Sequence, residues 1–269
     1  MAHAFDIVCD DGCDLSAEDA AALGVAVVPT LPPARRGHLA TADAEALAAA
    51  YRSAEAPVVI SLHTSSRLAD TLSAAEPHAG ERVRIVDTGT MSAGLGLLVR
   101  LAARLRDSGA TVEEALKRLH DAAETMRIAM VTTPDEKPLA GGAGRPRFEL
   151  LAHADSLKAR IVGERRLIGV KSSERPVELL RTTDLSDATG RAAHLMSNYA
   201  ARMGTLSYVL IVGGNEAAAR QLAKPLDTNE FEARPLGRAY AGSLTRSLAG
   251  AGCAGVAYLP QALIPELLS

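Results

Sequence analysis

The stretch Val58-Val59-Ile60-Ser61-Leu62-His63-Thr64-Ser65-Ser66-Arg67-Leu68-Ala69-Asp70-Thr71-Leu72 decides the fold. It begins as a short apolar run with β-branched residues, which is typical of a strand. Its second half has the spacing of a helix with one apolar face, formed by Leu68, Leu72 and Ala75. Between the two halves lie three hydroxyl residues, which cap helices because their oxygens accept bonds from the first free backbone N–H groups. The stretch therefore predicts a strand that runs directly into a capped helix.

A strand followed at once by a helix aims the helix N–H donors at the carboxyl edge of the sheet. Open α/β sheets bind ligands at that edge, and helix N-termini favour anions. Thr64, Ser65 and Ser66 are therefore a candidate site for a carboxylate or a phosphate. From the turn alone, a capped turn without a ligand is the preferred interpretation of these residues.

The first half of the chain alternates strands with helices. Strands are predicted over residues 5–9, 25–29, 58–62 and 82–87, and helices over 16–24, 42–53, 66–75, 92–107 and 111–126. Thr111 and Glu114 have the spacing of a capping box at the start of the last helix. This order predicts an N-terminal three-layer α/β domain with a parallel sheet, covering residues 1–125.

In the second half, strands follow one another with fewer helices between them. Strands are predicted over 128–132, 157–162, 166–170, 208–212, 231–236 and 255–259, and helices over a short segment starting at Pro176, 190–203 and 215–226. Residues 134–146 are rich in Gly and Pro and are expected to be irregular. We expect residues 126–269 to form an α+β domain with a mixed or antiparallel sheet.

Composition excludes several classes of partner. The chain has 269 residues with a net charge of −3, no block of basic residues and only 3% aromatic residues, so nucleic acid is not an expected partner. No apolar run reaches the roughly 20 residues that a membrane-spanning helix needs, so membrane insertion is not expected. Three cysteines without metal-ligand spacing, and no leader sequence at the start, favour a cytoplasmic protein without a metal or cofactor.

Few residues suggest catalysis. His63, at the end of a predicted strand, could be a phospho-acceptor or a packed histidine, and the packed histidine is preferred. Asp10 and Asp87 could form an acid–base pair, but loop capping is the preferred interpretation. The glycine-rich residues 141–145 lack the Lys-Ser/Thr of a phosphate-binding loop. Because no complete nucleophile–base or metal set is present, a non-catalytic protein is expected.

The order and spacing of several segments resemble the DegV family of bacterial fatty-acid-binding proteins. The segments are residues 7–15, Val27-Val28-Pro29, His63-Thr64-Ser65-Ser66-Arg67-Leu68-Ala69-Asp70-Thr71, Val86-Asp87-Thr88, 92–96, 131–133, 157–161 and 255–258. The resemblance implies two domains that enclose an apolar tunnel, with the carboxylate of a long-chain fatty acid or similar amphiphile near the Ser-Ser motif. It also implies a carrier that presents the acyl chain to a fatty acid kinase.

The resemblance carries over to particular residues. The ligand-binding candidates are Thr64, Ser65, Ser66, Asp10, Thr88, Ser92, Ser243 and Arg246. Arg175 resembles the basic position that faces the kinase, although a solvated loop charge is the preferred interpretation.

Three departures from the family pattern indicate a divergent member. A Thr-Ser-Gln-Pro segment is missing before Val58, Ala69-Asp70 replaces a Ser-Gly, and Leu248 stands where a histidine is expected. The loss of these polar residues, which would help to hold the carboxylate, suggests weaker fatty-acid binding or a different amphiphile. A phosphocarrier or enzyme that uses His63 is the alternative function.

Overall fold

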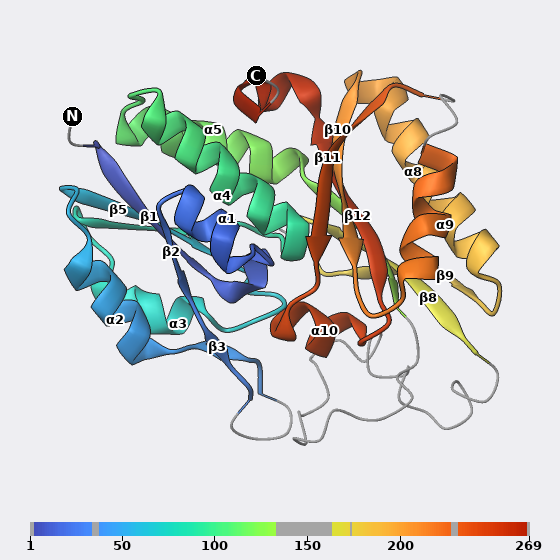
Figure 1. The fold of residues 1–269 in the computed structure, drawn as a ribbon, viewed down its shortest axis with the longest axis horizontal. Coiled ribbons are helices and arrows are strands. Elements are labelled where there is room, and N and C mark those ends of the chain that lie inside the picture. The colour runs from blue at the N-terminus through green and yellow to red at the C-terminus, as the bar shows by residue number, and fades with distance from the viewer. Residues whose placement is uncertain (1–2, 34–37, 133–162, 173, 227–230, 268–269) are drawn as a thin grey trace.

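Two β-sheets and the helices packed on them form alternating layers in the part of the chain that the structure describes. This part comprises residues 3–33, 38–132, 163–172, 174–226 and 231–267. In the computed structural model, a central pair of helices separates the two sheets, and further helices cover the outer face of each sheet (Figure 1). The predicted α/β class, with a parallel sheet followed by a mixed sheet, is confirmed.

The first sheet is parallel, with the strand order β2-β1-β5-β6. Its strands are β1 (Phe5–Asp10), β2 (Val25–Val28), β5 (Val58–His63) and β6 (Val83–Asp87). Side chains alternate along each strand, so Ile7 faces the central helices, whereas Val8 faces the outer helices. Because the strands are parallel, β1, β5 and β6 all end at one edge of the sheet.

Four helices flank this sheet. They are α1 (Ala17–Ala22), α2 (Ala44–Ser53), α4 (Ser92–Asp107) and α5 (Val112–Thr125). The helix α4 lies between the two sheets, and 13 of its 16 residues are buried. Small residues allow this close packing: a Cβ atom on Gly96 would come within 2.7 Å of the Cys13 carbonyl oxygen. The predicted capping box of α5 is confirmed, with Thr111 and Glu114 bonding each other's backbone N–H groups.

The second sheet is mixed, with the strand order β11-β10-β12-β7-β8-β9. Its strands are β7 (Arg127–Thr132), β8 (Arg165–Lys171), β9 (Val177–Thr182), β10 (Leu206–Val212), β11 (Ala233–Tyr240) and β12 (Ala254–Pro260). The helices α8 (Leu185–Met203) and α9 (Glu216–Leu226) cover its outer face. One apolar core spans α4, α5 and residues of both sheets, so the division into domains 1–125 and 126–269 stays a prediction.

The helix predicted to start at Pro176 is wrong, because the residues that follow form β9. Among the described strands it lies at the edge of the sheet and pairs only with β8. A proline just before an edge strand costs no ladder hydrogen bond. The side chain of Leu179 packs over Gly169 of β8, where a Cβ atom would meet it at 2.7 Å. Packing against β8 therefore decides the conformation of this segment.

Several shorter elements complete the described fold. They are η1 (Asp11–Cys13), β3 (Thr30–Leu31), β4 (Thr41–Ala42), α3 (Leu72–Ala75), η2 (Glu76–His78), α10 (Ser243–Ala249), η4 (Gln261–Leu263) and η5 (Pro265–Leu267), where η marks a 3₁₀ turn. The sequence did not predict α10. The predicted strand 157–162, the irregular segment 134–146 and the glycine-rich residues 141–145 lie outside the described residues.

Candidate functional site

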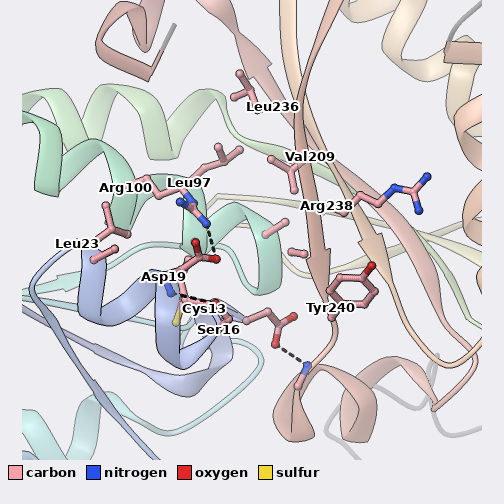
Figure 2. A pocket seen from close by; sticks show the side chains of 18 of the residues that line it. Cys13, Ser16, Asp19, Leu23, Leu97, Arg100, Val209, Leu236, Arg238 and Tyr240 are labelled. Atoms are coloured by element: carbon pink, nitrogen blue, oxygen red, sulfur yellow. Dashed lines mark hydrogen bonds and ion pairs between the residues drawn. The ribbon is translucent and has the colours of Figure 1, made fainter. Parts of the chain in front are cut away.

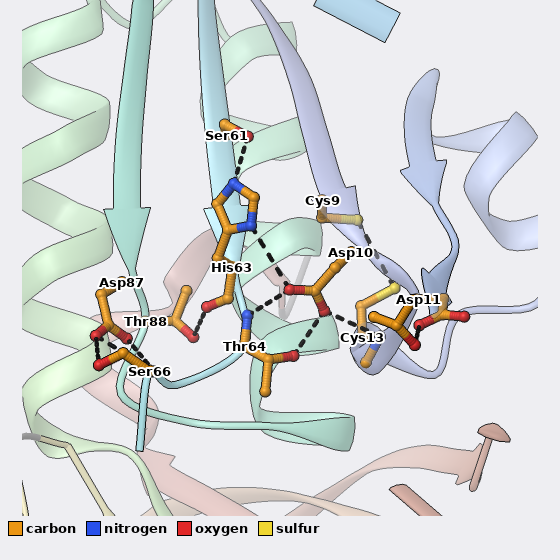
Figure 3. Close-up of polar contacts among 12 residues, drawn as sticks. Cys9, Asp10, Asp11, Cys13, Ser61, His63, Thr64, Ser66, Asp87 and Thr88 are labelled. Atoms are coloured by element: carbon orange, nitrogen blue, oxygen red, sulfur yellow. Dashed lines mark hydrogen bonds and ion pairs between the residues drawn. The ribbon is translucent and has the colours of Figure 1, made fainter. Parts of the chain in front are cut away.

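Asp10, at the end of β1, is buried and accepts hydrogen bonds from the loops that follow β1 and β5. Its carboxylate accepts bonds from Gly12 N–H (3.0 Å), Thr64 N–H (2.7 Å) and the Thr64 hydroxyl (2.6 Å) (Figure 3). Burial raises the pKa of Asp10, although the hydrogen bonds from Thr64 oppose that shift. Asp10 therefore links the turn that follows β5 to the turn that follows β1.

Asp87 has the same role at the end of β6. It accepts bonds from Gly89 N–H (3.0 Å) and from the Ser66 hydroxyl (2.6 Å). The strand β5 lies between β1 and β6, so Asp10 and Asp87 sit on either side of it and each binds its own loop. The preferred interpretation of both residues as loop caps is confirmed.

His63 is fully buried between these two carboxylates. Its Nε2 lies 2.8 Å from Ser61 Oγ, and its Nδ1 lies 3.7 Å from Asp10 Oδ2 (Figure 3). Burial lowers the pKa of His63 to about 4, with the nearby Asp87 acting in the opposite direction. The ring is therefore neutral at pH 7 and has no exposed nitrogen, which confirms the packed histidine and leaves no access for a phosphoryl donor.

The helix predicted directly after β5 is not formed. Residues 64–71 make turns, and the four-residue helix α3 starts only at Leu72. The cause is a parallel bridge between Asp70 and Thr41, in which Asp70 N–H donates to the Ala40 carbonyl (2.7 Å). The expected helix N-terminus at Thr64–Ser66 is therefore wrong. Asp70 is exposed outside α3.

The hydroxyl groups of this turn have partners within the protein. Besides the bonds of Thr64 and Ser66 to the two aspartates, Ser65 Oγ accepts a bond from Arg67 N–H (3.3 Å). Thr88 donates its hydroxyl hydrogen to the His63 carbonyl (2.7 Å). Each of these hydroxyl groups thus has at least one partner within the protein, and the ligand role of Thr64, Ser65, Ser66 and Thr88 stays a prediction.

Asp14 joins three segments that are far apart in the sequence. It follows η1 and accepts bonds from the Ser92 hydroxyl of α4 (2.5 Å), Gly242 N–H (2.8 Å) and the Thr245 hydroxyl of α10 (2.8 Å). Burial raises the pKa of Asp14 to about 6, against the effect of these hydrogen bonds. The sequence alone does not indicate this role of Asp14, because its partners lie 78 to 231 residues away and no local motif marks them.

A cavity of about 680 Å³ lies beside this junction. Elements from both sides of the molecule enclose it: η1 and α1, one face of α4, and strands β10 and β11 with the start of α10 (Figure 2). Its larger apolar side chains are Leu15, Leu23, Leu97, Val209, Leu236 and Leu267. Its charged side chains are Asp11, Asp14, Asp19, Arg100, Arg104, Asp107 and Arg238.

The cavity and the predicted ligand residues overlap only in part. Ser243 lines the cavity, whereas the other seven candidates are not among its lining residues. Asp10 and the Thr64–Ser66 turn lie at the edge of the first sheet, and Arg246 is exposed on α10. Ser92 reaches the cavity only through its bond to Asp14. Arg175 is exposed in the turn between β8 and β9.

The cysteines and acidic residues were compared with the arrangement that a metal ion needs, within the described part of the chain. Cys9 and Cys13 are buried free thiols with their sulfur atoms 3.7 Å apart (Figure 3). Among the described residues, no group of three His, Cys, Asp or Glu side chains is arranged to hold a metal ion. None of the described helices is long and apolar enough to cross a membrane.

Comparison with known proteins relates the chain to one family. Residues 38–134 match the family model described as "Uncharacterised protein, DegV family". A DegV domain-containing protein from Deinococcus radiodurans is 28% identical over 273 residues, which cover 93% of this chain and 85% of the relative.

Two solved structures share the fold over almost the whole chain. One is described as "Fatty Acid Binding of a DegV family Protein from Thermus thermophilus"; it has a TM-score of 0.76 at 20% identity, over 95% of this chain and 99% of its own. The other is the DegV family protein Cg2579 from Corynebacterium glutamicum, with a TM-score of 0.74 at 19% identity, over 95% and 96% of the two chains. The resemblance of this chain to the DegV family is thereby confirmed.

Proposed function

We propose that the protein is a non-catalytic carrier that holds a fatty acid or a similar amphiphile in the cavity between its two sheets. The observation that carries the proposal is the cavity itself. It lies between elements of both halves of the chain, and its lining combines apolar side chains with three arginines and four aspartates. Such a combination suits a ligand with an alkyl chain and an anionic head group.

The size and lining of the cavity support an alkyl ligand. Its volume of about 680 Å³ lies within the range of roughly 300–1,000 Å³ that is typical of small-molecule sites. Each CH₂ group that leaves water contributes about 0.8 kcal/mol, so even a partly buried acyl chain gains several kcal/mol. Leu97 of α4 lies opposite Val209 of β10, and both can contact such a chain (Figure 2).

The fold gives separate support. The Thermus thermophilus protein, which matches over 95% of this chain, is described as binding fatty acid. The three free cysteines are buried and form no disulfide, which suits the reducing cytoplasm in which we place the protein. The burial of His63 counts against the alternative of a phosphocarrier.

We further propose that the carrier presents its ligand to a fatty acid kinase. Arg175 is exposed in the β8–β9 turn and is available to an acidic partner surface. In that same turn, Ser172 packs over Gly89, which follows β6, so the turn lies beside the carboxyl edge of the first sheet. This position lets a partner contact Arg175 and the first sheet at the same time.

Native mass spectrometry of the freshly purified protein tests the carrier function. A bound mass that is released by solvent extraction and identified as a fatty acid or another amphiphile is the expected result. An apo mass that persists after incubation with fatty acids of different lengths would overturn the proposal. For the kinase, Arg175→Glu is expected to weaken partner binding, while Arg234→Glu, on the opposite edge of the second sheet, serves as the control.

A further inference from the structure

The charged side chains of the cavity are not distributed evenly along α4. Helix residues three or four apart share a face, so Ala93, Leu97, Arg100 and Arg104 follow one another along the cavity wall. The face is small and apolar near the start of α4, carries Arg100 and Arg104 toward its end, and finishes with Asp107. Arg104 lies seven residues beyond Leu97, which is about 10 Å along the helix axis.

The other end of the cavity is acidic. Asp11 and Asp14, on and after η1, line it next to the start of α10. Neither carboxylate has an ion-pair partner among the residues that the structure describes, and Asp14 is already held in a setting that disfavours its charge. A second carboxylate placed at this end would be repelled by both.

Toward the end of α4, Arg104 differs from its charged neighbours, which are paired within the described part of the chain. Arg100 forms an ion pair with Asp19 (2.9 Å), and Asp107 forms one with Arg106 (2.8 Å). Arg104 is exposed at the rim, and no ion pair joins it to any described residue. An anion at this end would therefore meet Arg104 directly and Arg100 beside it.

We infer that Arg104, assisted by Arg100, binds the carboxylate of the ligand, with the acyl chain running along α4 toward Leu97. This inference rests on the proposed carrier function. It assigns the head group to the rim of the cavity. There, two arginines would replace the polar residues that the family pattern has at the positions of Ala69 and Leu248. In this arrangement the head group does not lie at the turn formed by Thr64–Ser66.

A pair of ligands that differ only in the head group tests the inference. Equilibrium dialysis of delipidated protein would measure the affinity for palmitate and for hexadecanol, which has the same chain length and no charge. Arg104→Gln is expected to weaken palmitate binding about fivefold, and Arg100→Gln/Arg104→Gln to weaken it further, with hexadecanol unchanged. Arg191→Gln, an exposed arginine on the distant helix α8, is the matched control and should change neither affinity.

Three results would overturn the inference. Arg104→Gln could leave palmitate binding unchanged while Ser65→Ala/Ser66→Ala selectively weakens it, which places the head group at the turn after β5. The arginine variants could weaken both ligands equally, which indicates damage to the cavity rather than a lost charge contact. If wild-type protein binds neither ligand, the carrier function itself fails, and this outcome is distinct from the first two.

Discussion

Asp14 and Ser92 are the only non-glycine residues with left-handed backbone in the described part of the chain, and they hydrogen-bond each other. Their φ angles are 51° and 52°, and Ser92 Oγ lies 2.5 Å from Asp14 Oδ2. A left-handed residue other than glycine costs about 1–3 kcal/mol and persists only where its surroundings hold it. Here the Asp14 carboxylate also binds Gly242 and Thr245. The two strained residues thus fasten η1, α4 and α10 at one end of the cavity.

Asp14→Asn is expected to alter how stability depends on pH. The pKa of Asp14 rises from 3.8 in the unfolded chain to about 6 in the folded protein. The folded state therefore binds more protons between these values, and the free energy of unfolding falls as pH rises from about 4 to 6. Asparagine is neutral at every pH and keeps one acceptor and two donors. The variant should lose this decline and gain stability relative to wild type as pH rises, by at most about 3 kcal/mol.

Urea denaturation of both proteins at several pH values between 4 and 7 measures this difference. A constant difference between wild type and variant across that range would show that Asp14 titrates normally. Asp19→Asn provides the control, because Asp19 lines the same cavity but lies at an exposed ion pair.

His63→Gln is expected to have the opposite pH effect. The pKa of His63 falls from 6.5 to about 4 on folding, so the unfolded chain takes up a proton first as pH is lowered. The free energy of unfolding contributed by this site is fully present above pH 6.5 and is lost as pH falls toward 4. The free energy of unfolding of the variant should not show this decrease. The difference in stability between wild type and variant should therefore become smaller as pH falls toward 4.

Nuclear magnetic resonance gives a direct readout of His63. Its ring signals, assigned by their disappearance in His63→Gln, should not shift between pH 7 and pH 5. A titration midpoint above pH 6 would mean that the ring is accessible to protons, and it would support the alternative function as a phosphocarrier.

The sequence predicted well those elements whose signals are local. The helix 92–107 matches α4 at both ends, and the capping box at Thr111 forms as expected. These features depend on periodicity and on contacts within a few residues, which a single sequence records. The strand that ends at His63 was found for the same reason.

Contacts between distant segments explain where the prediction failed. The bridge from Asp70 to Thr41 prevents a helix after β5, and pairing with β8 makes a strand of the residues after Pro176. The cavity combines α4 with β11, which lie more than 100 residues apart. No local pattern reveals such contacts, so the sequence does not indicate this cavity, and the ligand role of the turn at Thr64 stays a prediction.

Leu236→Trp tests whether an acyl chain enters the cavity. Leu236 is half-buried on β11 and lines the cavity, and the chain has no other tryptophan, so the new side chain would be the only indole fluorophore. Addition of palmitate should shift its emission to shorter wavelength, because the alkyl chain replaces water around the ring. Leu31→Trp, at an exposed leucine outside the cavity, should show no shift. Equal shifts in both variants would indicate non-specific association with the lipid.

Gly12→Ala tests the packing between the end of β1 and α10. A Cβ atom at this position would collide with the Thr64 hydroxyl and would lie 2.8 Å from both Asp10 Oδ1 and Leu244 Cδ2. The Asp10–Thr64 bonds and α10 would have to move, so we expect a loss of about 1–3 kcal/mol in the free energy of unfolding. Gly80→Ala is the matched control, because nothing lies within 4 Å of its added Cβ atom. If urea denaturation finds equal effects for the two substitutions, α10 is not packed tightly against η1, and the acidic end of the cavity is open rather than closed by that contact.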